Sequence, residues 1–195
     1  MYFSIRSAIA ALLLLTLTGC SSIYRTTGWF AYDFAEDYAM PYVMKTDDTE
    51  MGCAMSESMT PMLLSFSELT WYPDRLATSM YMQAGACAEA QANEEGLTYL
   101  RAYKAQNIGE AKDARIRQKR LFSLAANRQY KAYKHLVAEF GEPGDVCPDL
   151  DEDEEFFWML GLVSGLQAVM SDVRGQGEVG VPKDIAMKSV RGSQC

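Results

Sequence analysis

The sequence predicts an all-α protein made of antiparallel helical hairpins. Helix-forming residues (Ala, Leu, Met, Glu, Lys and Gln) are abundant, and no window keeps the apolar–polar alternation of a half-buried strand. Several segments instead carry apolar residues at intervals of three and four, which is the spacing of one helix face. Proline and glycine separate these segments, so we expect helices joined by short connections.

The first nineteen residues have the layout of a secretory signal. Arg6 precedes an apolar run over residues 8–17, which is too short to cross about 30 Å of hydrocarbon as a helix. The run ends in Leu-Thr-Gly-Cys at residues 17–20, which resembles the lipobox of bacterial lipoproteins. Small residues there leave the backbone open to a peptidase, and only a thiol can carry the thioether-linked diacylglycerol. The alternative is an ordinary signal with a chance cysteine.

The lipobox predicts cleavage before Cys20 and a lipid anchor on that cysteine. The resemblance implies a bacterial lipoprotein carrying fatty acyl chains of the palmitate type. Ser21 stands where an Asp is linked, in many enteric-type bacteria, to retention on the inner membrane. We therefore expect attachment to the outer membrane, facing the periplasm.

The remaining chain divides into a tether at residues 20–48 and a helical domain at residues 49–195. Removal of the signal takes the 18 basic residues to 17 against 26 acidic ones, because Arg6 is lost, giving a net charge of −9. This acidity argues against a nucleic-acid partner and against adhesion to anionic lipid by charge. The tether has aromatic residues at near-helical spacing beside acidic ones. It either lies at the bilayer interface or, as its charge favours, packs onto the domain.

Five helices are expected in the domain. Apolar spacing from Met55 to Phe66 marks the first, which is either kinked by Pro61 or restarted there. The second is expected from about Arg75 after a turn at residues 72–74, and the third over residues 109–140. The fourth opens after the acidic residues of 149–153 and includes an uncharged stretch at residues 156–170, and the last starts at residues 181–183. In the second helix, the helical spacing of the apolar residues becomes unclear at residues 93–96. Gly161 and Gly165 predict a close approach of a neighbouring helix.

The cysteines other than Cys20 are expected to form two disulfides. Their number is even, which in an exported protein favours oxidation with three possible connectivities. If the first two helices form an antiparallel hairpin about Pro73, Cys53 and Cys87 lie on adjacent helices. Their positions along the helix axes then differ by no more than about 1.5 helical turns. This favours Cys53–Cys87 and leaves Cys147 with Cys195.

No residue constellation indicates an enzyme, a cofactor or a metal site. Ser164 is one register from a nucleophile-elbow motif and lacks the preceding strand, so we interpret it as a core serine. Asp149, Asp151 and Asp153 begin like a calcium loop but lack its later residues, and a charged helix start explains them better. His135 is the only histidine and has no partner at ligand spacing.

Basic residues are concentrated between residues 112 and 134, where eight stand against one acidic residue, Asp113. They form either a docking face for an acidic partner or a solvated face paired with the acidic stretch at residues 149–155. The candidate partner-binding residues are Arg115, Arg117, Lys119 and Arg120.

The order of features resembles the TRAP-transporter-associated T-component lipoproteins over roughly residues 45–190. The segments that show this resemblance are Ser-Met-Thr-Pro-Met at 58–62, Glu-Ala-Lys at 110–112, Asp-Glu-Glu-Phe-Phe-Trp at 153–158 and Val-Pro-Lys at 181–183. The resemblance implies a periplasmic fold of degenerate tetratricopeptide-like hairpins, and association with the substrate-binding protein of a TRAP-type transporter. This chain ends where the family pattern continues, and its four further cysteines are not part of that pattern.

Together these features predict a membrane-anchored periplasmic lipoprotein that acts as a non-enzymatic docking or scaffold component. The alternative is a small envelope lipoprotein with a structural or stress role and no connection to transport. The sequence gives no indication of oligomeric state, ligand or partner identity.

The lipid anchor can be tested by substitution at Cys20. Because the thioether forms on its thiol, Cys20→Ala is expected to abolish fatty-acid labelling, leave the precursor uncut and remove the protein from the detergent phase on partitioning. Cys147→Ala should leave labelling unchanged. A Cys20→Ala protein that still matures and stays membrane-bound would exclude the lipobox interpretation.

Overall fold

The chain is all-α wherever its structure is described. The computed structural model describes residues 73–144 and 147–194, which hold four helices and no strand. The helices are α4 (Pro73–Lys104), α5 (Ile108–Phe140), α6 (Glu152–Arg174) and α7 (Asp184–Gly192). The predicted first helix, the tether and the signal lie outside the described residues, as do Cys20, Cys53 and Cys195.

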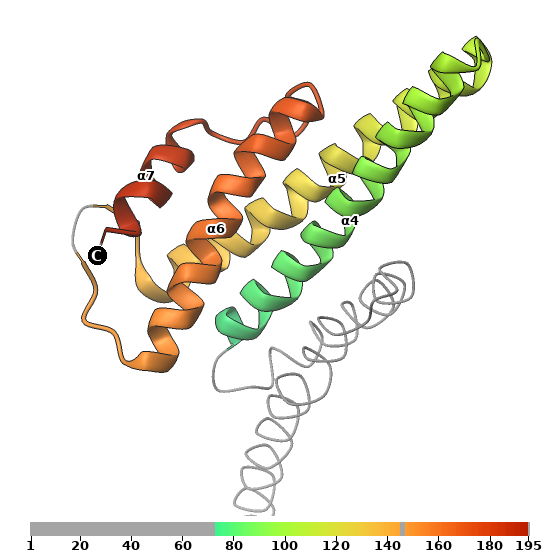
Figure 1. The fold of residues 1–195 in the computed structure, drawn as a ribbon. Helices are drawn as coiled ribbons and strands as arrows, with labels where there is room; N and C mark the ends of the chain where they lie inside the picture. The colour runs from blue at the N-terminus through green and yellow to red at the C-terminus, as the bar shows by residue number, and fades with distance from the viewer. Residues whose placement is uncertain (1–72, 145–146, 195) are drawn as a thin grey trace, which may run out of the picture.

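Helices α4 and α5 run antiparallel along their whole lengths (Figure 1). The seam between them is rich in small residues because alanine lets two helix backbones approach closely: Ala77, Ala84, Ala88, Ala92, Ala111, Ala114, Ala125 and Ala132 are all buried. The connection is short. Gln106 takes a positive φ of 60°, and the side chain of Asn107 caps α5 by accepting a hydrogen bond from the backbone N–H of Glu110.

Helix α6 crosses α5 at a contact that only glycine permits (Figure 1). A Cβ on Gly161 would lie 2.5 Å from the Cβ of Leu136, and one on Gly165 would lie 2.5 Å from the ring of Tyr133. The predicted close approach at these two glycines is therefore confirmed. Leu136 is 1% exposed and Tyr133 is 3% exposed, so both form part of the core. Burial raises the pKa of the Tyr133 phenol, and the carboxylate of Glu142 beside it acts in the same direction.

Helix α7 folds back against α6 and closes the core. The indole N–H of Trp158 donates to the carbonyl of Gly192 at the end of α7, and Phe140 meets the Trp158 ring edge to face. The carboxylate of Asp172 accepts hydrogen bonds from the backbone N–H groups of Val179 and Val181. These bonds hold the α6–α7 connection, so the buried charge at Asp172 has donors on both oxygens.

Helix boundaries follow local chemistry, with three differences from expectation. The expected end at Gly141 is confirmed by its φ of 87°, and Asp151 forms a capping box with Glu154 at the start of α6. The turn expected at residues 72–74 is wrong in part, because α4 already begins at Pro73. Helix α4 is unbroken through residues 93–96, and α7 begins at Asp184 rather than residue 181.

Two of the four cysteines fall in the described residues. Cys87 lies buried on α4, and Cys147 lies exposed in the connection before α6. Both are disulfide-bonded. The pairings Cys53–Cys87 and Cys147–Cys195 each include a cysteine outside the described residues, so the connectivity stays a prediction.

Filling the helix crossing should destabilise the domain. Gly161→Ala adds a methyl group where Leu136 already lies, and overpacking of this kind costs about 1–3 kcal/mol, which exceeds the gain of about 1 kcal/mol in helix propensity. Thermal or urea unfolding monitored by circular dichroism measures the loss. The matched control is Gly109→Ala in the first turn of α5, where the nearest atom would be 3.9 Å away and no loss is expected. Equal stability of the two variants would contradict this description of the crossing.

Candidate docking surface

The basic residues of α5 do not share one face. Arg115 and Lys119 lie four residues apart on one side of the helix, and Lys112 lies on that side too. Arg117 and Arg120 lie three residues apart on another side. The structure therefore brings together two of the four candidate residues with Lys112 and separates them from the other two.

The side of α5 that carries Lys112, Arg115 and Lys119 continues the surface that α6 contacts. Positions 108, 112, 115 and 119 are in helical phase with Phe122, and the guanidinium of Arg174 at the end of α6 lies over the Phe122 ring. Positions 96, 100 and 103 of α4 are in phase with Glu89, which accepts a hydrogen bond from Arg174 at 3.0 Å. Both helices thus present one surface on the α6 side, beyond the point where α6 ends.

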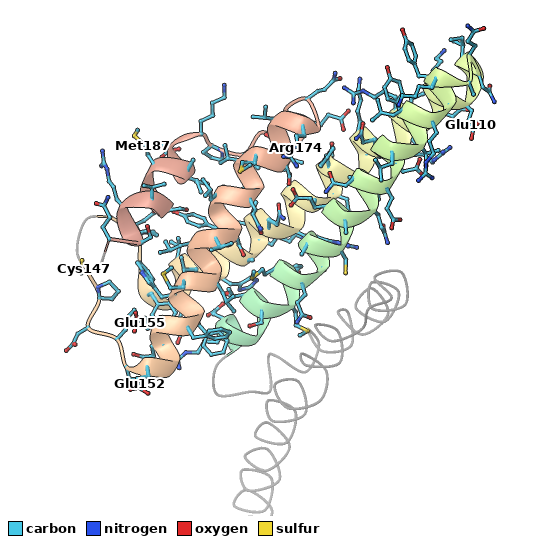
Figure 2. All side chains as sticks on the ribbon, in the orientation of Figure 1. Glu110, Cys147, Glu152, Glu155, Arg174 and Met187 are labelled. Carbon is cyan, nitrogen blue, oxygen red and sulfur yellow. The ribbon has the colours of Figure 1, made fainter. Side chains whose placement is uncertain are left out.

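We call this surface the shelf; its members are Leu100, Tyr103, Ile108, Lys112, Arg115 and Lys119. The three apolar members are 51–66% exposed, so they add apolar area beside the basic groups. From Phe122 to Ile108 the shelf extends about 20 Å at 1.5 Å per residue. Figure 2 shows the tip of the α4–α5 pair, marked by Glu110, reaching well past Arg174.

Local contacts fix the shape of the shelf. The Arg115 guanidinium lies 5.8 Å from the centre of the Tyr99 ring, and Tyr99 stacks on Tyr103. The ammonium of Lys119 donates to the side-chain oxygen of Gln176 in the α6–α7 connection. Arg115 thus lies over an aromatic pair, whereas Lys119 is held by the α6–α7 connection.

Two acidic side chains of the tip, Glu95 and Glu110, have other partners. Glu95 accepts both hydrogen bonds of a bidentate pair from Arg117, at 2.8 and 3.0 Å. The hydrogen bond from Arg117 to Glu95 raises the pKa of this guanidinium, although desolvation acts against the rise. Glu110 accepts from the amide of Asn107. The shelf consequently has three basic groups and no acidic member.

Pairing of the shelf with the acidic stretch at residues 149–155 is ruled out by distance. That stretch lies at the other end of α5, where Glu154 and Glu139 both bind Arg75. Arg115 precedes Glu139 by 24 residues, which is about 36 Å along a helix. Pairing with residues 149–155 is therefore wrong for Arg115, Arg117 and Lys119, and Arg117 pairs with Glu95 instead.

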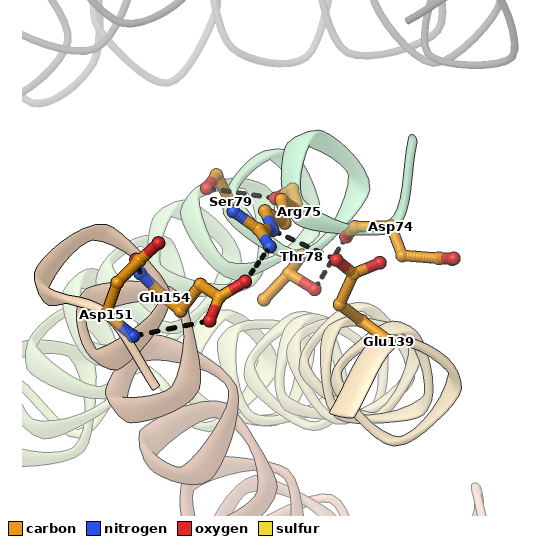
Figure 3. A network of polar contacts seen from close by, with 7 residues as sticks. All are labelled: Asp74, Arg75, Thr78, Ser79, Glu139, Asp151 and Glu154. Atoms are coloured by element: carbon orange, nitrogen blue, oxygen red, sulfur yellow. Dashed lines mark hydrogen bonds and ion pairs between the residues drawn. The ribbon is translucent and has the colours of Figure 1, made fainter. Parts of the chain in front are cut away.

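The Arg75 network joins the three long helices at this opposite end (Figure 3). Arg75 of α4 donates to Glu139 of α5 at 3.0 Å and to Glu154 of α6 at 2.6 Å. Burial alone would lower the pKa of Arg75, but the hydrogen bonds and charges of the two glutamates raise it. Glu154 also accepts from the backbone N–H of Asp151, so the same side chain closes the capping box. The sequence alone does not predict this network, because Arg75 is 64 residues from Glu139 and 79 residues from Glu154.

The other residues considered for chemistry have structural surroundings. Ser164 is fully buried and donates to the carbonyl of Leu160, as expected of a core serine. His135 has a partner that sequence reasoning missed, since its Nδ1 lies 2.7 Å from a carboxylate oxygen of Asp74 and its ring stacks on Tyr81. The part of the chain that the structure describes holds no group of three or more His, Cys, Asp or Glu able to bind a metal.

No protein-family model, curated protein or solved structure matches this chain.

The Arg75 network should contribute more to stability than the exposed Arg117–Glu95 pair. The Arg75 side chain is 10% exposed, so Arg75→Gln leaves two carboxylates in a part-buried site and should cost about 1–3 kcal/mol in the free energy of unfolding. Arg117→Gln is the matched control; its side chain is 49% exposed, and no measurable change in unfolding midpoint is expected. Urea unfolding of both variants decides the matter. Equal losses of unfolding free energy in the two variants would show that the burial of Arg75 does not determine its contribution to stability.

Proposed function

We propose that this protein is a non-enzymatic docking lipoprotein, anchored through Cys20, that binds an acidic periplasmic protein on the shelf. The observation that carries the proposal is the contrast in charge between the chain and this surface. A chain of net −8 presents Lys112, Arg115 and Lys119 together, with no acidic member among them. Exposed apolar side chains beside them supply the desolvated contact that charge alone does not give.

The shelf suits a partner that presents carboxylates beside apolar groups. Arginine and lysine steer such a partner toward the surface and mainly raise the association rate. Leu100, Tyr103 and Ile108 can then lose contact with water, which slows dissociation. A shelf at the far end of the long helix pair also lies away from the Arg75 network, so binding need not disturb the core.

The resemblance to T-component lipoproteins suggests a class of partner. Under the proposal, the docked protein is the substrate-binding protein of a TRAP-type transporter, and the lipid anchor keeps both at the periplasmic face of the outer membrane. The tetratricopeptide-like character of the fold belongs to the same proposal. The rival role, a structural envelope lipoprotein without a transport partner, requires no selective surface.

The proposal predicts that charge reversal on the shelf weakens partner binding without unfolding the protein. Arg115→Glu with Lys119→Glu should reduce recovery of the partner in envelope pull-downs by at least about tenfold, since close charge pairs at interfaces contribute more than 1.4 kcal/mol. Added salt should lower recovery by wild type, because the Debye length near 0.15 M is about 8 Å.

Arg120→Glu with Lys134→Glu provides the matched control. It makes the same change of four charge units on the same helix, at exposed positions outside the shelf. The control should keep wild-type recovery, and both doubles should keep the wild-type thermal midpoint. Undiminished recovery by the shelf double, or an equal loss in the control, would refute docking at the shelf.

A further inference from the structure

Helix α6 carries an apolar stripe on the side away from α4, α5 and α7. Its members are Phe156, Met159, Val163, Leu166, Met170 and Val173. They follow one another at intervals of three and four, so they lie on one helix face, and they are 37–64% exposed. The opposite face carries the glycines that contact α5 and the indole that contacts α7. A surface helix normally has polar residues where this stripe lies.

Three possible environments for the stripe can be compared: a bilayer, the tether of the same chain, and a second copy of the protein. By length and composition α6 could cross a membrane, but half of its apolar window is buried within the protein. Spanning would expose the glycine face and break the Leu136 and Tyr133 contacts. The stripe begins beside Glu152 and Glu155, both exposed, and this charge disfavours anionic lipid and the acidic tether equally.

We infer that the α6 stripe is the interface of a homodimer, in which two copies of α6 pack antiparallel across a two-fold axis near Val163 and Leu166. The two ends of the stripe are flanked by opposite charges. Figure 2 shows Glu152 and Glu155 at the start of α6 and Arg174 at its end, so antiparallel pairing would place the acidic start of one α6 beside Arg174 of the other copy. Arg174 is 44% exposed on its side chain, so it can meet a partner's carboxylate while it keeps Glu89.

The size of the stripe suits a two-fold contact. Its members span 17 helical steps, or about 26 Å. Six side chains of this exposure present on the order of 500 Å², and a symmetric contact doubles this to about 1,000 Å², the lower bound for a specific interface. Methionines at two of the positions adapt readily to an identical opposing surface. The stripe and the shelf share no residue, so the dimer and the proposed docking function can be tested with separate variants.

Sedimentation velocity of the protein purified with its lipid anchor, in density-matched detergent at tens of micromolar, tests the inference. Wild type is expected to sediment as a dimer. Leu166→Glu should raise the dimer dissociation constant by at least about a hundredfold, because the axis would bury two unpaired carboxylates. Leu100→Glu, an equally polar change at an exposed leucine of the shelf, should remain dimeric. Circular dichroism melts should show that both variants stay folded.

Other results would overturn the inference. A monomeric wild type refutes it, and so does a Leu166→Glu variant that remains dimeric. If wild type is monomeric and Leu166→Glu alone loses binding to phosphatidylethanolamine vesicles, a membrane surface covers the stripe instead. If both glutamate variants dissociate the dimer, the interface is not confined to the α6 stripe and the inferred two-fold contact is wrong.

Discussion

The close contact between α5 and α6 determines where the other features of this domain lie. Two glycines, Gly161 and Gly165, bring the α6 backbone against Leu136 and Tyr133, at distances that no larger residue allows. A helix placed this closely has one orientation on its neighbour, because the packing of interior side chains leaves little freedom. The Arg75 network and the α6–α7 turn at Asp172 then fix its two ends.

The position of α6 explains both exposed surfaces. Because α6 ends at the level of Glu89 and Phe122, the last part of the α4–α5 pair projects beyond it and presents the shelf. Because the glycine face points inward, the apolar stripe on the opposite face points outward. One surface combines positive charge with aromatic groups, whereas the other is uncharged along most of its length. Surfaces of such different chemistry suit different partners.

The sequence was sufficient for features determined within a few residues of one another. The all-α class, the end of α5 at Gly141, the charged start of α6 and the close approach at Gly161 and Gly165 follow from propensity, capping and spacing. These predictions are confirmed because each depends on local backbone chemistry. The division of the basic residues between two faces of α5 was also available from helical spacing, but a count of charges along the chain conceals it.

The interactions that could not be predicted join residues far apart in sequence. Examples are His135 with Asp74, and Gln129, whose buried amide points toward Glu89 and Gln167. Nothing in a helical pattern specifies which polar residues of three helices will meet. Cys20 lies outside the described residues, so the lipid anchor stays a prediction, as does the docking partner.

The side chain of Leu136 fills the space that a Cβ on Gly161 would need, and a double-mutant cycle measures this directly. In the wild-type background, Gly161→Ala is expected to destabilise the protein. In a Leu136→Ala background the leucine side chain is gone, so the added methyl group should be neutral or stabilising by up to about 1 kcal/mol through helix propensity. Equal losses in both backgrounds would contradict the account, because they would show that the glycine is required for another reason.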